Sequence, residues 1–311
     1  MRIIHEPGRY IAIEENGVER LRYCYQLPDD PAPSAPKPYF HPIRTPEGIE
    51  VTADAPLDHF WHRGIWFAWK YINGVNYWEE NQEIVGRQVT LEPPTVAPLG
   101  ALGAVGAARD SVRLLSTVAW RDTVSGTEET RLLEERQLEI HLKAEGTIVL
   151  DWLSRHQAQE AVLLDRTPYT TWGGYSGLAV RLTQALQRQK IVFDDGTESD
   201  NPIGEPHSWG ALEGQLDTGK DRFVRVVFMP SPQSRRFPEP FYGRAKAFYN
   251  FFGPAPLFHE PLPLEAQEIL EYRVRVLILC AKVATKDINK YYNEWLEQEG
   301  ASSAYADEAT P

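Results

Sequence analysis

Apolar and polar residues alternate with a period of two along most of this chain. The alternation occurs in RYIAIEEN, in the next run GVERLRYCYQL, and in later runs such as SVRLLSTVAW and EYRVRVLIL. A period of two puts successive side chains on opposite faces of a half-buried strand. Asn16-Gly17, which separates the first two runs, is typical of a hairpin turn. The pattern therefore predicts short β-strands, with the first two paired as a hairpin.

Further runs of the same kind bring the expected total to roughly fifteen strands. The later strands are expected over residues 60–67, 87–94, 100–109, 111–122, 126–142, 146–158, 161–169, 177–184, 190–195, 207–216, 222–230, 245–252 and 269–279. They follow one another without helices between them, which argues against a doubly wound α/β fold. The chain is predicted to be all-β, a large antiparallel two-sheet β-sandwich.

One helix is expected, near the end of the chain, over residues 285–300. Thr285 can cap its start, and Gly300 is expected to end it. Its apolar side chains form a single stripe, made of Ile288, Tyr291, Tyr292, Trp295 and Leu296. No linker divides the chain, so residues 1–300 are predicted to form a single β-sandwich domain, and residues 301–311 a flexible C-terminal tail.

Charge and cysteine usage narrow the class of protein. The 311 residues carry a formal net charge of −12 and contain no polybasic run, which excludes nucleic acid and anionic membranes as expected partners. No secretory leader or membrane-spanning run is recognisable. Cys24 and Cys280 are too few and too far apart for a disulfide framework. The expected location is therefore cytoplasmic.

Candidate chemistry gathers in the stretch KPYFHPIRTPEGIEVTADAPLDHFWHRGIW, residues 37–66. It contains His41, His59 and His62, three of the eight histidines in the chain. Pro38 and Pro42 bracket His41 and are expected to hold it on a stiff loop. His59 and His62 would point to opposite sides if residues 60–67 are extended, so their spacing does not imply a shared metal ion.

Histidine can exchange a proton near neutral pH, which makes His41 and His62 the predicted acid, base or ligand. The five donors of Arg63 suit sugar hydroxyls or a carboxylate. A structural interpretation stays open for each of these residues. The histidines can hydrogen-bond loop backbone between aromatic rings, and Arg63 can clamp a carbonyl or Asp58.

Four further polar positions are candidates for substrate binding. One of the adjacent Glu79 and Glu80 could point inward, although a solvated position is favoured for each. Arg181 lies in an apolar strand, where it needs a carboxylate partner or an anionic ligand, and structural pairing is favoured. His259 and Glu260 lie before Pro261 on a second stiffened loop.

Several of these motifs, in order, resemble the PmoA-like family, which carries the label methane oxygenase. They are KPYFHPIRTPEG, DHFWHRGIWFAW, NGVNYWEE, GLAVRL and FFGPAPLFHEPLPLEAQEILEYRVRV. Phe60 and Trp61 replace a Pro and a His of the family pattern, and Phe237 stands where a later His is typical. The resemblance implies a β-sandwich with a mutarotase-like outline and a setting in bacterial sugar catabolism.

The first functional hypothesis is a carbohydrate-active enzyme, a glycoside or keto-glycoside hydrolase or lyase, with His41, His62 and Arg63 as catalytic residues. Its small-molecule carbohydrate would be bound by Lys37, Tyr39, Asp58, His59, Trp66, Trp78, Glu79, Arg181, His259 and Glu260. A non-catalytic carbohydrate-binding protein is the alternative. A divalent metal ion held by His41, His62 and either an acidic residue or His259 also stays open, as does a homo-oligomer.

Overall fold

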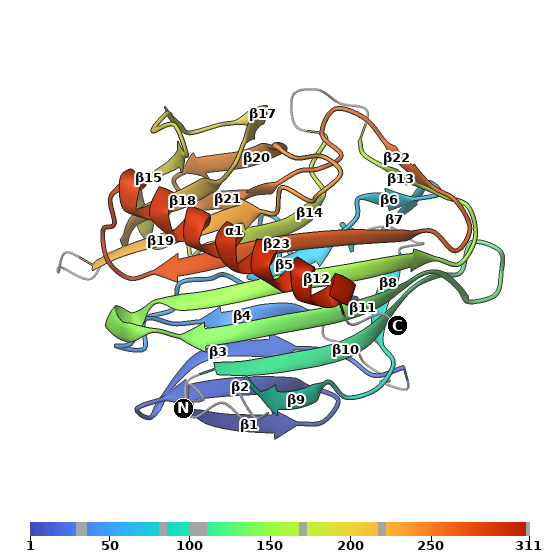
Figure 1. Ribbon diagram of the computed structural model, residues 1–311, viewed down its shortest axis with the longest axis horizontal. Helices are drawn as coiled ribbons and strands as arrows, with labels where there is room; N and C mark the ends of the chain where they lie inside the picture. The colour runs from blue at the N-terminus through green and yellow to red at the C-terminus, as the bar shows by residue number, and fades with distance from the viewer. Residues whose placement is uncertain (29–35, 81–85, 100–110, 168–172, 217–221, 309–311) are drawn as a thin grey trace.

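The computed structural model describes residues 1–28, 36–80, 86–99, 111–167, 173–216 and 222–308. Two large sheets, in which neighbouring strands run antiparallel, lie face to face (Figure 1). The first sheet has the order β1 (Arg2–Glu6), β2 (Tyr10–Glu15), β3 (Val18–Cys24), β4 (Tyr39–Ile43), β5 (Ile65–Ala68), β14 (Gly177–Arg181), β21 (Tyr249–Pro254), β20 (Glu239–Lys246) and β17 (Ile203–His207).

The second sheet is built mostly from long meandering strands. Its order is β16 (Glu198–Ser199), β15 (Leu186–Phe193), β18 (Gly210–Leu216), β19 (Arg222–Pro230), β23 (Ile269–Leu279), β12 (Ile148–Ala158), β11 (Glu129–Leu142), β10 (Ser111–Asp122) and β8 (Arg87–Thr90), with β9 (Thr95–Pro98) also on β10. A small sheet joins β22 (Leu262–Leu264), β13 (Val162–Asp165), β6 (Tyr71–Ile72) and β7 (Val75–Asn76). A 3₁₀ turn, η1 (Ala144–Gly146), links β11 to β12.

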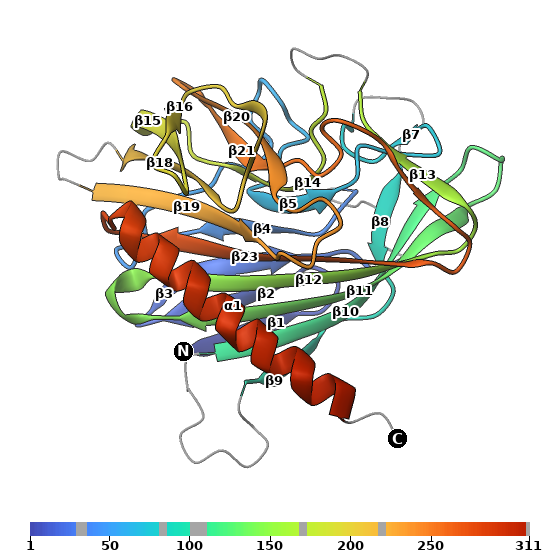
Figure 2. The same ribbon diagram turned by 45° about the horizontal axis from the view of Figure 1, so that its top comes forward.

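The helix α1 (Thr285–Glu308) lies across the outer face of the second sheet (Figure 2). Ile288, Tyr292 and Trp295 pack there against outward-facing residues of β12, β19 and β23 such as Val149, Val227 and Leu277. Burying this stripe shields sheet residues that would otherwise lie in water. The predicted two-sheet sandwich with a C-terminal helix is therefore confirmed.

Alternation of side chains assigns each strand one face toward the core. Phe40, Ile65 and Phe67 of the first sheet meet Trp120 and Trp152 of the second, and all are buried. The aromatic rings contact one another across the sheets, as in the 6.2 Å pair of Phe40 and Trp152. This packing leaves the opposite face of the first sheet available to carry other groups.

The local details agree with the expectations in one place and differ from them in two. The first hairpin forms as predicted, with β2 paired to β3 across Asn16 and Gly17. Residues 245–252 are not one strand, because Ala247 and Phe248 form the turn between β20 and β21. The helix does not end at Gly300 but continues to Glu308, and the expected strand at 100–109 lies outside the described residues.

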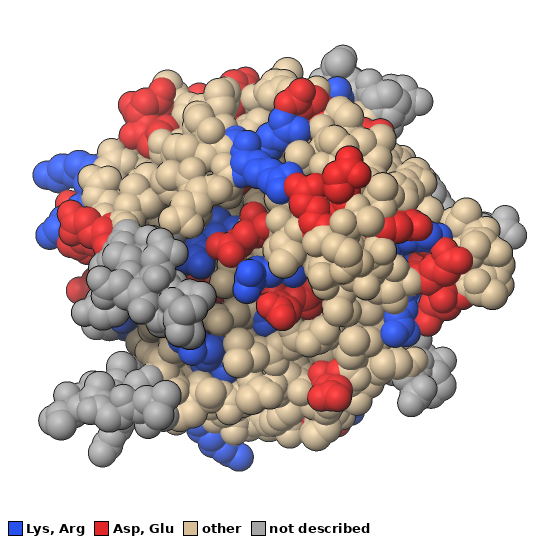
Figure 3. Space-filling view, turned by 45° about the vertical axis from the view of Figure 1, so that its right-hand side comes forward, with Lys and Arg blue, Asp and Glu red and all other residues tan. Residues whose placement is uncertain are grey.

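Among the described residues, no helix is long and apolar enough to cross a membrane. Figure 3 shows one face of the molecule, on which Lys and Arg side chains lie interspersed with Asp and Glu.

A charged pair lies inside the sandwich, where the alternation pattern predicts apolar residues. Glu134 and Arg136 are two residues apart on β11, point to the core, and form a two-pronged ion pair with N–O distances of 2.7 and 2.8 Å. Arg136 also donates to Gln88 and to the hydroxyl of Tyr23, which belongs to the other sheet. Burial alone would raise the pKa of Glu134, but Arg136 lowers it to about 2. The pair thus links the two sheets through hydrogen bonds.

We expect Arg136→Met to lower the free energy of unfolding by about 3–5 kcal/mol, because it leaves the buried carboxylate of Glu134 without its cation. Chemical denaturation measures this. The control is Arg155→Met, on the outer face of the next strand, where the ion pair to Glu135 is long and exposed and the loss should stay below about 1 kcal/mol. Equal losses in the two variants would contradict this role of Arg136.

Candidate functional site

The outer face of the first sheet carries a second aromatic layer. Tyr39, Trp66, Ala179 and Phe251 come from four neighbouring strands, β4, β5, β14 and β21, and all point away from the core. Above them lies a cavity of about 270 Å³. It is lined by His59, Trp61, His62, Trp78, Glu79, Tyr175, Tyr242, Tyr249 and Phe251. The cavity therefore combines aromatic rings with a carboxylate and two imidazoles.

Loops complete the cavity, and short-range hydrogen bonds shape them. The amide of His59 donates to the carbonyl of Pro56, and the amide of His62 donates to the carbonyl of His59. These bonds fold residues 56–62 into consecutive turns. In a second loop, the side-chain oxygen of Asn76 accepts from the amides of Trp78 and Glu79, so this loop turns Glu79 toward the cavity.

A glycine permits the first loop to join the sheet. Gly64 has φ of +63°, a backbone conformation that residues with a side chain rarely adopt. A Cβ added at this position would lie 2.1 Å from the carbonyl oxygen of Phe40. Gly64 exchanges backbone hydrogen bonds with Ala53 and Arg181. Only glycine allows the backbone to pass this close to β4.

Arg181 joins the segments around the cavity. Its side chain is fully buried at the end of β14. One guanidinium nitrogen donates to Asp58 at 2.6 Å and to the carbonyl of Phe248 at 2.9 Å, while another lies 3.3 Å from Nδ1 of His62. The guanidinium also lies over the ring of Tyr249, at 4.4 Å from its centroid. The expected structural pairing of Arg181 is thus found, with Asp58 as the carboxylate.

His59 and His62 do not diverge, contrary to the expectation of an extended segment. The turn from His59 to His62 puts both imidazoles on the same side, stacked with centroids 4.8 Å apart. The local hydrogen bonds that close the turn override the strand-like residue pattern. The two rings then share the environment of the cavity but differ in their partners.

His62 is positioned as a neutral hydrogen-bond donor. It lies between Trp66 and Phe251, with centroid distances of 5.0 and 4.9 Å. Burial, together with the positive charge of Arg181, holds the pKa of His62 well below its ordinary value. Because Arg181 donates to Nδ1, the proton of the neutral ring is on Nε2. Of the acid, base and ligand roles predicted for His62, this geometry suits donation of a hydrogen bond from Nε2 to an oxygen.

His59 has the complementary arrangement. Its Nδ1 lies 3.0 Å from a carboxylate oxygen of Asp58, which accepts the ring proton there. Nε2 then carries a lone pair, and the hydroxyl of Tyr249 lies 3.5 Å from it. An aspartate on Nδ1 orients an imidazole and stabilises its charged form. The pair therefore leaves Nε2 of His59 free to accept a hydrogen bond or a proton.

Glu79 supplies the carboxylate of the cavity wall. It accepts hydrogen bonds from Asn76 and from the hydroxyl of Tyr175, both at 2.7 Å, and it pairs with the buried Lys70. Burial alone would raise the pKa of Glu79, but Lys70 and these donors lower it below the ordinary value. Glu79 is thus ionised at neutral pH, and burial beside Glu79 raises the pKa of Tyr175, which stays protonated.

Glu80 also points inward, so the expectation of a solvated position is wrong for both carboxylates. It pairs with Arg63 at 2.6 Å and with Lys37 at 3.2 Å. Lys37 is fully buried and donates to the carbonyl of Trp78 at 2.6 Å. Burial lowers the pKa of Lys37 to about 8, against the opposing effect of Glu80. Arg63, predicted to be catalytic, is held by Glu80 and Asp54 behind the cavity wall and is not among the lining residues.

His41 is likewise outside the cavity lining. It lies in strand β4 rather than on a loop, and the following His41–Pro42 bond is cis. Its Nδ1 is 3.0 Å from the hydroxyl of Thr52, and its Nε2 is 3.8 Å from Glu50. The structure therefore does not bring His41 to the other predicted catalytic groups. Tyr39 and Trp66 lie beneath the cavity, whereas Trp78 lines it.

The loop that carries His259 and Glu260 contributes no lining residue. Nε2 of His259 donates to the carbonyl of Gly204 at 2.9 Å, and Glu260 pairs with Arg236. Within the described residues, the three-residue clusters with metal-ligand spacing are Glu139–His141–Asp151 and Asp194–Asp195–His207. Neither includes His41, His62 or His259, so the ligand set expected from the sequence is not assembled.

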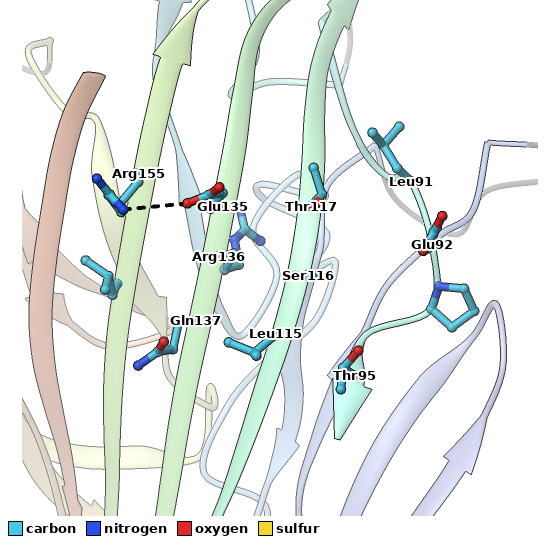
Figure 4. Close-up of a pocket in the computed structure, with 12 residues that line it drawn as sticks. Leu91, Glu92, Thr95, Leu115, Ser116, Thr117, Glu135, Arg136, Gln137 and Arg155 are labelled. Atoms are coloured by element: carbon cyan, nitrogen blue, oxygen red, sulfur yellow. Dashed lines mark ion pairs between the residues drawn. The ribbon is translucent and has the colours of Figure 1, made fainter. Parts of the chain in front are cut away.

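A larger hollow of about 560 Å³ lies on the second sheet (Figure 4). Residues of β10, β11 and β12 and the segment 91–95 line it, and Glu135 and Arg155 pair between the neighbouring strands β11 and β12. No aromatic ring or histidine is among these described lining residues. The smaller cavity, which combines both, is the candidate site.

A sequence model of a family of unknown function (DUF6807) matches residues 10–293. The chain belongs to this family. The expected assignment to the PmoA-like family is wrong, because the match is to DUF6807 and nothing shows a PmoA-like relationship. The motifs that carried the resemblance are short, and they depart from the pattern at Phe60, Trp61 and Phe237.

No curated protein matches this DUF6807 chain. Among solved structures, the α-galactosidase from Lactobacillus brevis is similar over 88% of this chain and 39% of that chain, at 10% sequence identity and a TM-score of 0.39. A similarity this low carries no argument about activity. The site must therefore be interpreted from its own geometry.

Sequence reasoning missed much of the cavity of this DUF6807 protein. Tyr175, Tyr242, Tyr249 and Phe251 line it, yet none of them was among the candidate residues predicted from sequence. A usable signal exists for two of them. Tyr249 and Phe251 alternate with the core residues Asn250 and Phe252 on β21, so a second buried face could have been inferred.

We expect the His62 ring of this DUF6807 protein to stay neutral, with its proton on Nε2, from pH 5 to 8. Imidazole nitrogen chemical shifts report tautomer and charge. Unfolded His62 gains a proton below about pH 6.5 whereas the folded form does not, so acidification destabilises the fold. His62→Gln should reduce this loss of stability between pH 7 and 5. Titration of His62 with a midpoint near 6.5 would contradict the assignment.

Proposed function

We propose that this protein is a carbohydrate-active enzyme that cleaves a small glycoside or keto-glycoside. The observation that carries the proposal is the combination of the Asp58–His59 pair, the ionised Glu79 and stacked aromatic rings around one cavity. If these polar groups only stabilised the fold, they would not need to surround one cavity. Perturbed ionisable groups that line a cavity are typical of functional sites.

The lining favours a sugar over other small molecules. Flat rings such as Trp61, Trp78 and Phe251 can stack on the C–H faces of a sugar, while the hydroxyls of Tyr175, Tyr242 and Tyr249 can bind its hydroxyls. At about 270 Å³ the cavity lies just below the usual range of ligand pockets, roughly 300–1,000 Å³. It suits one sugar ring rather than an extended polymer.

The proposed chemistry assigns one role to each polar group. For a keto-glycoside, Nε2 of His59 removes the proton beside the carbonyl, and the electron pair forms an enolate. The enolate then expels the glycosidic oxygen, which takes the proton back from the His59 imidazolium. Asp58 stabilises that imidazolium, and the Nε2–H of His62 can donate to the enolate oxygen. Water added to the eliminated product would complete a hydrolysis.

Glu79 has a different role, because a carboxylate that is ionised at neutral pH cannot act as the acid. It can stabilise positive charge that develops on the sugar ring, or bind sugar hydroxyls as an acceptor. For an ordinary glycoside, His59 would then protonate the leaving group.

The unpaired thiols of Cys24 and Cys280 suit the reducing conditions of a cytoplasmic location.

The test begins with a panel of glycosides and 3-keto-glycosides, with products identified by NMR. We expect His59→Gln to lower turnover by about 10²–10⁴-fold, the usual contribution of a general base, while substrate still quenches tryptophan fluorescence. Glu79→Gln should also lower turnover. The matched control is His41→Gln, which removes a histidine outside the cavity and should leave turnover unchanged.

Three results would contradict the proposal. Unchanged turnover in His59→Gln would remove its acid–base role. Loss of turnover in His41→Gln alone would restore the site expected from the sequence. Binding of sugars without turnover by the wild type would favour a non-catalytic carbohydrate-binding protein.

A further inference from the structure

A third hollow, on the second sheet, has a strongly cationic lining. It measures about 360 Å³ and is lined by Arg188, Lys190, Glu213, Gly214, Gln215, Phe223, Arg225 and Lys282. Four of these described residues are cations and one is a carboxylate, in a chain whose formal net charge is −12. A local excess of positive charge inside a concave surface attracts anions.

This cationic hollow lies on the outer face of the second sheet, beside the start of α1. Ala211 and Val227 of β18 and β19 pack against the helix. Glu213 and Arg225 lie two residues along the same strands, on the same face, and Arg225 donates to the carbonyl of Val283 just before α1 begins. The candidate site lies on the outer face of the other sheet, so the two sites are separate.

A β-bulge places Arg188 in the lining of the cationic hollow. The paired residues are Gln187 with Gln215 and then Lys190 with Glu213, which leaves one extra residue on β15. Strict alternation would turn Arg188 to the core side, opposite to the exposed Gln187. Instead Arg188 has φ of +49° and lines the hollow. Bulges redirect side chains in this way, and backbone strain concentrates at ligand sites.

Two of the four cations are neutralised by carboxylates of the sheet. Arg225 is buried and pairs with Glu213, which is buried as well. Lys190 pairs with Glu198. These pairs join neighbouring strands, β18 with β19 and β15 with β16, so the positive charges of Arg225 and Lys190 are balanced within the fold.

The other two cations, Arg188 and Lys282, are exposed and form no ion pair with any described residue. The ammonium of Lys282 lies over the ring of Phe223, 5.7 Å from its centroid. An arginine can bind two oxygens of one anion, and a lysine adds a compact charge on a flexible stem. The cationic hollow therefore offers two unbalanced positive charges to a ligand.

We propose that the cationic hollow binds a phosphate group, with Arg188 and Lys282 as the side chains that hold it. A phosphate monoester carries about two negative charges at neutral pH, which matches the two unbalanced cations, and its three oxygens can accept from both side chains. A carboxylate ligand would balance one charge only. An extended polyanion is disfavoured because the chain as a whole is strongly acidic.

The size of the cationic hollow favours a phosphorylated small molecule over free phosphate. Its volume of about 360 Å³ is within the usual range of small-molecule pockets, roughly 300–1,000 Å³. The organic part of an ester then has room beside the phosphate. This inference does not rest on the proposed function, because it uses none of the residues of the candidate site.

Isothermal titration calorimetry of the full chain at low ionic strength tests the site with inorganic phosphate, glycerol 3-phosphate and acetate. Both phosphates should bind, and acetate should bind at least about tenfold more weakly because it satisfies one cation only. Tighter binding of the ester identifies a phosphorylated molecule as the ligand. Equal binding of the two phosphates identifies the phosphate group alone as the recognised part.

Arg188→Gly should weaken phosphate binding by about tenfold, the loss expected for one charge-assisted hydrogen bond. Its melting temperature should not fall, because glycine adopts a positive φ without strain. Lys282→Gln should act on binding in the same direction. The matched control is Arg155→Gln, which removes a partly exposed arginine from the outer face of the same sheet and should keep the full affinity.

Three results would overturn the phosphate site. They are no binding of either phosphate at millimolar concentration, equal affinity for acetate and phosphate, and an equal loss of affinity in Arg155→Gln and Arg188→Gly. The proposed function would stand after any of them, since its own test uses glycosides and the variants of His59 and Glu79.

Discussion

The candidate site depends on the buried guanidinium of Arg181. A cation at the end of an apolar strand must find partners, and Arg181 finds them in Asp58, the carbonyl of Phe248 and the ring of His62. Because these partners come from two loops far apart in sequence, one side chain fixes the loops relative to each other. The same contacts set the chemistry of the imidazoles. Burial and the charge of Arg181 together lower the pKa of His62, and Arg181 determines its tautomer, while Asp58, anchored by Arg181, orients His59.

The sandwich can carry such a site because its core lies elsewhere. Between the sheets, apolar rings and the Glu134–Arg136 pair hold the structure together. The outer face of the first sheet is then free for Trp66, Phe251 and the loops above them. Lys37, Lys70 and Arg63 are buried beside this face, each with a carboxylate partner. Burying a charged side chain without a partner costs free energy. Three buried cations, each with a carboxylate partner, therefore show that this outer layer is built from ion pairs as well as from apolar contacts.

Much of the fold could be predicted from sequence because strand alternation is a local signal. The period of two identified the hairpin of β2 and β3, and the stripe of Ile288, Tyr292 and Trp295 identified the helix. The site was harder because its determinants are nonlocal or depend on backbone turns. The cluster of His59, His62 and Asp58 was found, but the turn that stacks the imidazoles was not, since the segment reads as extended. Glu79 and Glu80 were predicted to lie on the surface because the sequence does not show which cations pair with them. Lys70 and Arg63 form these ion pairs only in the folded chain. Tyr175 gave no signal of the cavity, and the alternation around Tyr249 indicates only a second buried face of β21.

The most direct measurement of the central claim is hydrogen–deuterium exchange on the variant Arg181→Met, compared with the wild type. If Arg181 holds both loops, amides of residues 53–64 and 246–249 should exchange faster in the variant, because their shared anchor is gone. Amides of β11 and β12, which belong to the other sheet, should keep their protection. Wild-type exchange in both loops of the Arg181→Met protein would contradict the account.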